Sequence, residues 1–238
     1  MRLYPLGSLD QKIPRKLLKW SIRYGIPLCR TPAKLRKFII LGNGYPDDKV
    51  IFMLSHRVNM SLQDTVSAGI LKPLYTYKRA LEVIEYLVSL FGIKERFDIL
   101  FVLDQDNKIV EEIISDILDF LKRKFYLGCT LDREMDRLFI YECQGDELSM
   151  SLLIAICGLG LREKYCSHKI EEQIIEFATN MGVIEEPKQQ ICDPKRLWNR
   201  LNESTKERIF NLLLTVEENV LNKFFGQQIS ALKILSSI

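Results

Sequence analysis

Two kinds of apolar pattern alternate along most of this chain. Residues 38–41 and 99–103 are short, uninterrupted apolar runs, which are typical of strands buried on both faces of a parallel sheet. Residues 109–125 and 170–181 instead repeat apolar positions every three or four residues, as amphipathic helices do. The alternation predicts an α/β fold with a central, mostly parallel sheet flanked by helices.

The same patterns predict the remaining elements. In chain order they are a helix over 76–91, a strand over 137–143, a buried helix over 149–159, and helices over 196–203, 204–225 and 226–236. Residues 49–55 fit either a second strand or the start of a helix, and residues 57–72 fit either a loop or a short helix. We therefore expect a basic N-terminal extension over 1–36, an α/β domain over 37–185 and a C-terminal helical subdomain over 194–238.

Composition narrows the class of protein. The chain has 238 residues, of which 47% are hydrophobic, so it can bury a sizeable core. Its six cysteines form no Cys-x-x-Cys pair and it has only two histidines, so a zinc site with the usual ligand spacing is not expected. No apolar run reaches the length of a membrane span and no signal peptide is visible, so we expect a cytoplasmic protein with mostly reduced thiols.

Charge is informative only locally. The net charge of +3 does not by itself demand a nucleic-acid partner. Residues 12–37, however, carry nine basic side chains and no acidic one, and those nearest the start are Lys12, Arg15, Lys16, Lys19 and Arg23. This segment fits either a solvated helix face or a surface that contacts the phosphates of a nucleic acid.

The strand at residues 99–103 ends in two acids, Asp104 and Asp106. In an extended chain both side chains point to the same side, and open parallel sheets place their sites at the carboxyl ends of strands. Two carboxylates there suit Mg²⁺ or Mn²⁺, which prefer oxygen ligands. Turn formation, or capping of the helix that follows, is the competing explanation for the same two residues.

Three stretches together resemble a known family. Residues 40–48 place Gly-Asn-Gly and then Asp-Asp after a strand, residues 103–106 place Asp-x-Asp before a helix, and residues 167–172 (Ser-His-Lys-Ile-Glu-Glu) open a helix. This order resembles the toprim family, which includes type IA topoisomerases, DnaG-type primases and overcoming-lysogenization-defect nucleases. Within that family the chain is most similar to an archaeal branch of single-domain toprim-like proteins, and the resemblance covers about residues 37–180.

The resemblance implies a toprim-like fold and a divalent-metal-dependent protein that acts on nucleic-acid phosphodiesters, as a nuclease or a related phosphotransfer enzyme. It implies that Asp104 and Asp106 hold Mg²⁺ or Mn²⁺. A third acid for catalysis would come from Asp47, Asp48, Glu171 or the neighbouring glutamate at 172. Gly44 and His168 belong to the same motifs and are further candidates for the site.

One position departs from the family. The glutamate that serves the family as general acid–base aligns with Asn43, and an amide cannot take up a proton at neutral pH. Either Asp47 or Asp48 supplies the missing carboxylate, or the chain is a catalytically inactive toprim-like module that binds nucleic acid or a partner protein. A third hypothesis is self-association through the apolar positions of the C-terminal helices, for which packing within one chain is the alternative.

Overall fold

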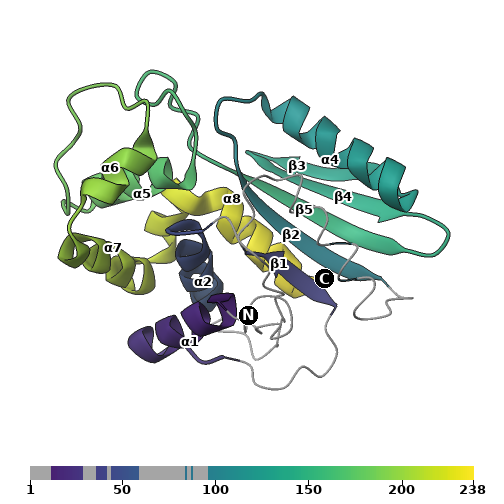
Figure 1. The fold of residues 1–238 in the computed structure, drawn as a ribbon, viewed down its shortest axis with the longest axis horizontal. Helices are drawn as coiled ribbons and strands as arrows, with labels where there is room; N and C mark the ends of the chain where they lie inside the picture. Colours follow the sequence, from purple (N-terminus) through teal and green to yellow (C-terminus); the bar gives the residue numbers. More distant parts are fainter. Residues whose placement is uncertain (1–11, 29–35, 42–43, 59–83, 85–86, 88–95) are drawn as a thin grey trace.

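A five-stranded mixed sheet forms the centre of the computed structural model, with helices against both faces (Figure 1). The structure describes residues 12–28, 36–41, 44–58, 84, 87 and 96–238, and of residues 12–14 only the backbone. The strands are β1 (Lys37–Ile40), β2 (Phe97–Asp104), β3 (Gly128–Met135), β4 (Leu138–Gln144) and β5 (Ser149–Cys157). The helices are α1 (Lys12–Tyr24), α2 (Asp47–Val58), α4 (Val110–Phe125), α5 (Ile170–Asn180), α6 (Pro194–Arg200), α7 (Glu203–Thr215) and α8 (Glu218–Ser237).

The strand order is β1-β2-β5-β4-β3. β1, β2 and β5 run parallel, and β4 and β3 add an antiparallel pair at one side. Seven of the eight residues of β2 are buried, as expected for a strand covered on both faces. The α/β class, the central strand and the helical tail are thus confirmed.

The two faces of the sheet bury separate apolar clusters. On one face, Leu100, Val102 and Leu153 pack with residues of α2, α5, α7 and α8. On the other, Ile99 and Phe101 pack with α4 and with Ile84 and Leu87. Figure 1 shows α4 on one side of the sheet and α2 and α8 on the opposite side. The sheet is therefore the middle layer of three, which leaves its strand ends as the natural place for a site.

Several predicted elements differ from the structure. The helices expected over 204–225 and 226–236 are instead α7, which ends at Thr215, and α8, which begins at Glu218. Residues 149–159, expected as a buried helix, contain β5, because a continuous apolar run does not distinguish a buried strand from a buried helix. β3 was not expected at all, since most of its residues are exposed and polar at the edge of the sheet. The open choice at 49–55 is resolved as helix α2, and most of the helix expected over 76–91 lies outside the described residues.

The expectation of reduced thiols is wrong for four cysteines. Cys129 and Cys143 form a disulfide across the paired strands β3 and β4. Cys166 and Cys192 form a second one, which ties the loop before α5 to the segment before α6. Cys157 is a free thiol buried in the core, as small apolar side chains often are.

Within the described part of the chain, no helix combines the length and apolar character needed to cross a membrane.

Candidate functional site

Acidic residues from three separate elements gather at the carboxyl end of the sheet. Asp104 is the last residue of β2, Asp47 and Asp48 lie in the first turn of α2, and Glu171 lies in the first turn of α5. The positive end of a helix dipole favours acids in its first turn, which explains why α2 and α5 both begin with them. Unusually for such acids, Asp47, Asp48 and Glu171 are each at least 95% buried.

These carboxylates raise one another's pKa. Burial raises the pKa of Asp104 to about 7, and the negative charge of Glu171 adds to the rise. Burial also raises the pKa of Asp47 well above its usual range, and the nearby charges of Asp104, Glu171 and Asp48 act in the same direction. The pKa of Glu171 is raised as well, chiefly by burial. The three groups therefore share one poorly hydrated region, where an additional positive charge would stabilise them.

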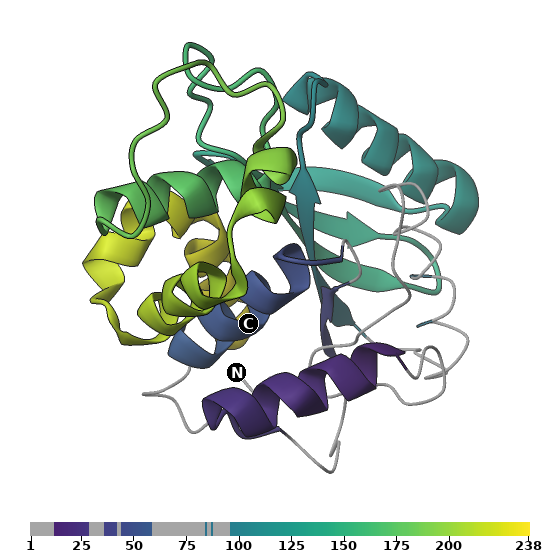
Figure 2. The same cartoon turned by 60° about the vertical axis from the view of Figure 1, so that its left-hand side comes forward.

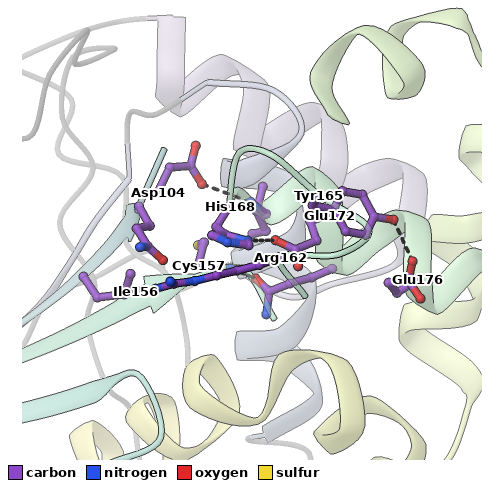
Figure 3. Close-up of polar contacts among 12 residues, drawn as sticks. Asp104, Ile156, Cys157, Arg162, Tyr165, His168, Glu172 and Glu176 are labelled. Carbon is purple, nitrogen blue, oxygen red and sulfur yellow. Dashed lines mark hydrogen bonds and ion pairs between the residues drawn. The ribbon is translucent and has the colours of Figure 1, made fainter. Parts of the chain in front are cut away.

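Two carboxylate oxygens of this group have no hydrogen-bond partner among the described residues. They are Asp47 Oδ1 and Glu171 Oε2, and both are buried. A buried, ionised oxygen without a partner is costly, so it calls for a proton or a cation. Asp104 differs, because its Oδ1 accepts a hydrogen bond from the Ile170 amide at 3.0 Å (Figure 3). We call Asp47, Asp104 and Glu171 the acid cluster.

Asp106 does not face the same way as Asp104. Its φ of 55° breaks the extended geometry on which the expected pairing depends. Its side chain is exposed and its Oδ1 lies 2.8 Å from Lys169 Nζ. Asp106 therefore pairs with Lys169 at the edge of the acid cluster. The charge of Asp106 raises the pKa of Asp104 and of Glu171, and the charge of Lys169 lowers both.

The acid cluster fits a hydrated divalent cation better than a fully ligated one. Among the residues that the structure describes, no three His, Cys, Asp or Glu side chains converge closely enough to enclose a metal ion. Mg²⁺ is often held by one or two carboxylates, with water and substrate phosphate completing its shell. The donors are all carboxylate oxygens, which suits Mg²⁺ or Mn²⁺ and argues against a softer metal.

A cleft of ≈580 Å³ opens at the loop that follows β2, where Gln105 and Asp106 line it; the residues of the acid cluster do not line it themselves. Its lining includes the basic residues Lys108, Arg137 and Arg162 together with Tyr165 and His168. Arg137 is fixed in place, because its guanidinium donates to the carbonyl of Cys157 at 2.7 Å and to Gln105 Oε1 at 2.6 Å. Sequence reasoning missed these basic residues, since they come from three separate loops and share no motif.

His168 is held by a buried carboxylate. Its Nδ1 lies 2.9 Å from Glu172 Oε2, and both side chains are almost completely buried (Figure 3). Burial raises the pKa of Glu172, and the hydrogen bond with His168 opposes that rise. The four-residue spacing on the chain is the signal that could have revealed this pair.

Gly158 makes room for this pair at the end of β5. A Cβ atom at Gly158 would lie 2.6 Å from His168 Cβ and 3.0 Å from Glu172 Oε2. Its φ of 102° is also a conformation that side chains rarely adopt. A glycine at the carboxyl end of β5 therefore allows the imidazole and the carboxylate to pack directly against the backbone.

Other predicted residues lie elsewhere. The basic helix α1 lies at the other end of the molecule from the tip of β2, as Figure 2 shows, so Arg15, Lys16, Lys19 and Arg23 are not beside the acid cluster. The side chain of Lys12 and all of Asn43 lie outside the described residues. The Gly44 carbonyl accepts a hydrogen bond from the Asp48 amide at 3.0 Å, which helps to begin α2.

No protein-family model, no curated protein and no solved structure matches this chain. The resemblance to toprim proteins therefore stays a prediction.

Proposed function

We propose that this protein is a divalent-metal-dependent, toprim-like phosphodiesterase that acts on nucleic acid, in which one or two carboxylates of the acid cluster hold a hydrated Mg²⁺ or Mn²⁺. The observation that carries the proposal is a pair of buried oxygens, on Asp47 and Glu171 next to Asp104, that have no hydrogen-bond partner among the described residues. Asp106, which pairs with Lys169, is left out of the ligand set.

A bound cation balances the charge of the acid cluster at neutral pH more readily than protonation of all three acids does. The raised pKa of Asp104, about 7, means that protons compete with a cation near neutral pH and are displaced when the cation binds. When bound, such a cation would offset phosphate charge and lower the pKa of a bound water. The hydrogen bond from the Ile170 amide keeps one oxygen of Asp104 in a fixed orientation, and this limits the reorganisation that binding requires.

The adjoining cleft supports a phosphate-containing substrate. Lys108, Arg137 and Arg162 line it, and Arg137 is held with its guanidinium in a fixed position. Guanidinium groups match the geometry of phosphate oxygens, and basic clefts attract polyanions. A nucleic-acid backbone lying in this cleft would contact Asp106 and His168, which belong to the same two chain segments as Asp104 and the start of α5.

The experiment measures metal binding and cleavage separately. Binding of Mn²⁺ is followed by the loss of the free-ion electron paramagnetic resonance signal, and cleavage by gels of labelled single- and double-stranded DNA and RNA. We expect Asp104→Asn/Glu171→Gln to lose Mn²⁺ binding by at least about tenfold, and to lose cleavage by about a hundredfold or more, because two charged ligands are removed.

The matched control is Asp146→Asn/Glu185→Gln, which removes the same charge from two exposed acids. It should bind Mn²⁺ and cleave like the wild type. Equal Mn²⁺ binding by the wild type and Asp104→Asn/Glu171→Gln, or no cleavage of any nucleic acid by the wild type, would contradict the proposal.

A second candidate function is binding without catalysis. It is favoured by Asn43 at the position of the family's general base and by the absence of three converging ligands among the described side chains. In that case nucleic acid would bind equally in chelator, and its affinity would fall steeply with salt as counterions are released. Cleavage that depends on Mn²⁺ would exclude it.

A further inference from the structure

His168 and Glu172 form a hydrogen-bonded pair that is not part of the proposed metal site. Glu172 accepts from Nδ1 of His168 at 2.9 Å, so we assign the imidazole proton to Nδ1. The other ring nitrogen, Nε2, then carries a lone pair. His168 lines the cleft, so the lone pair on Nε2 can face the proposed substrate.

The pair is fixed next to the acid cluster by the backbone. Asp106 and His168 exchange two backbone hydrogen bonds, of 3.0 Å and 3.1 Å, and the Ile170 amide donates to Asp104. The segments 104–106 and 168–170 therefore run side by side, which places His168 and the acid cluster on the same two pieces of chain. Gly158 lies against the Cα and Cβ of His168 and against Glu172 Oε2, which fixes where the pair sits at the end of β5.

We propose that His168 is the general base of the reaction and that Glu172 is a positioning residue, which holds the imidazole with Nε2 toward the cleft. This inference rests on the proposed function, and it supplies the base that Asn43 cannot. Nε2 takes a proton from the attacking water while its oxygen bonds to phosphorus. The bond from phosphorus to the leaving sugar oxygen breaks, that oxygen takes a proton from solvent, and His168 later returns its proton to solvent.

Glu172 is the charged group in direct contact with the imidazole. The same cleft is also lined by charged residues from three loops and the start of α4, namely Asp106, Lys108, Glu111, Arg137 and Arg162. Replacing the Glu172 carboxylate should therefore leave the imidazole less firmly oriented.

The test compares rates and metal binding in the full-length protein. His168→Gln should bind Mn²⁺ like the wild type but cleave about 10²–10⁴-fold more slowly, because an amide cannot take up a proton. The loss should appear in kcat rather than in KM, since the amide keeps the size of the side chain.

Glu172→Gln tests the positioning role. We expect kcat about ten- to a hundredfold lower at unchanged KM and unchanged Mn²⁺ binding, because the imidazole loses the anionic acceptor that orients it. Glu163→Gln, an exposed acid in the same loop, should leave kcat and KM unchanged.

The outcomes separate the two proposals. If the wild type cleaves, and His168→Gln cleaves with the same kcat, His168 is not the base and the metal-dependent function stands. If the wild type cleaves nothing, the proposed function fails and the role of His168 fails with it. Loss of Mn²⁺ binding in a folded His168→Gln, checked by circular dichroism, would show a structural role and overturn the inference.

Discussion

Buried carboxylates are the main feature that identifies the candidate site. An acid in the first turn of a helix is ordinary, and the sequence alone allowed Asp47, Asp48 and Glu171 to be no more than that. What distinguishes Asp47 and Glu171 is burial together with an oxygen for which the described part of the chain supplies no hydrogen-bond partner. Burial depends on which elements pack over a side chain, so neither observation was available from residue type and spacing.

Asp104 should make the metal-free protein less stable as pH rises. Its pKa is raised from 3.8 to about 7 in the folded chain, so its contribution to stability is complete below pH 4 and is lost as pH rises through 7. Asp104→Asn removes this loss and keeps an oxygen to accept from Ile170. In chelator we expect it to raise the free energy of unfolding at pH 8 by about 2 kcal/mol, and by close to zero at pH 4.

Urea denaturation across pH 4–8 measures this effect, with Asp146→Asn as the exposed control. The advantage of Asp104→Asn should disappear when Mn²⁺ is added, because the cation stabilises only the wild type. A variant that is less stable than the wild type at every pH would show that Asp104 serves mainly as a hydrogen-bond acceptor for α5.

Loops contribute most of the residues that line the cleft, and the loop between β5 and α5 is one of them. Cys166 begins the stretch that carries His168, and its disulfide to Cys192 spans 26 residues. Tyr165 adds a hydrogen bond to Glu176 of α5 at 2.7 Å (Figure 3). These links hold the loop against α5, and the sequence could not reveal them, since cysteine spacing does not determine disulfide pairing.

Removing this disulfide should destabilise the protein. For Cys166→Ser/Cys192→Ser we expect a loss of about 3 kcal/mol in the free energy of unfolding, because the unfolded chain regains the freedom of a closed loop. Urea denaturation measures the loss, with Cys129→Ser/Cys143→Ser as the comparison for the shorter loop. Peptide mapping without reductant checks the bond directly, and free thiols at Cys166 and Cys192 in the wild type would contradict the prediction.

The C-terminal helices and the sheet form one structure around the site. Residues of α7 and α8 share an apolar cluster with β2 and β5. The Gln227 side chain on α8 donates to the carbonyls of Ile156 and Gly158 at 3.2 Å, which fixes the end of β5 where the histidine packs. Helix α8 thus stabilises the end of β5 that borders the candidate site.

A substitution that leaves a cavity in the apolar cluster shared by the sheet and the C-terminal helices should therefore destabilise both. We expect Leu232→Ala, at a fully buried position of α8, to cost about 2–5 kcal/mol. Urea unfolding followed by far-UV circular dichroism, and by Trp198 fluorescence in a Trp20→Phe background, should give coincident curves. An earlier transition reported by Trp198 would instead indicate that residues 194–238 unfold as a separate unit.

The sequence by itself determined the α/β class, the buried central strand with its terminal aspartate, the main helices, and the acids from which a site is built. These features depend on local periodicity, which neighbouring residues encode. The tertiary structure alone decided that 149–157 is a strand, that Asp104 lies with Asp47 and Glu171 while Asp106 pairs with Lys169, and that Glu172 holds His168 against Gly158. Burial, charge coupling and packing arise between segments far apart in the chain, so no local pattern encodes them.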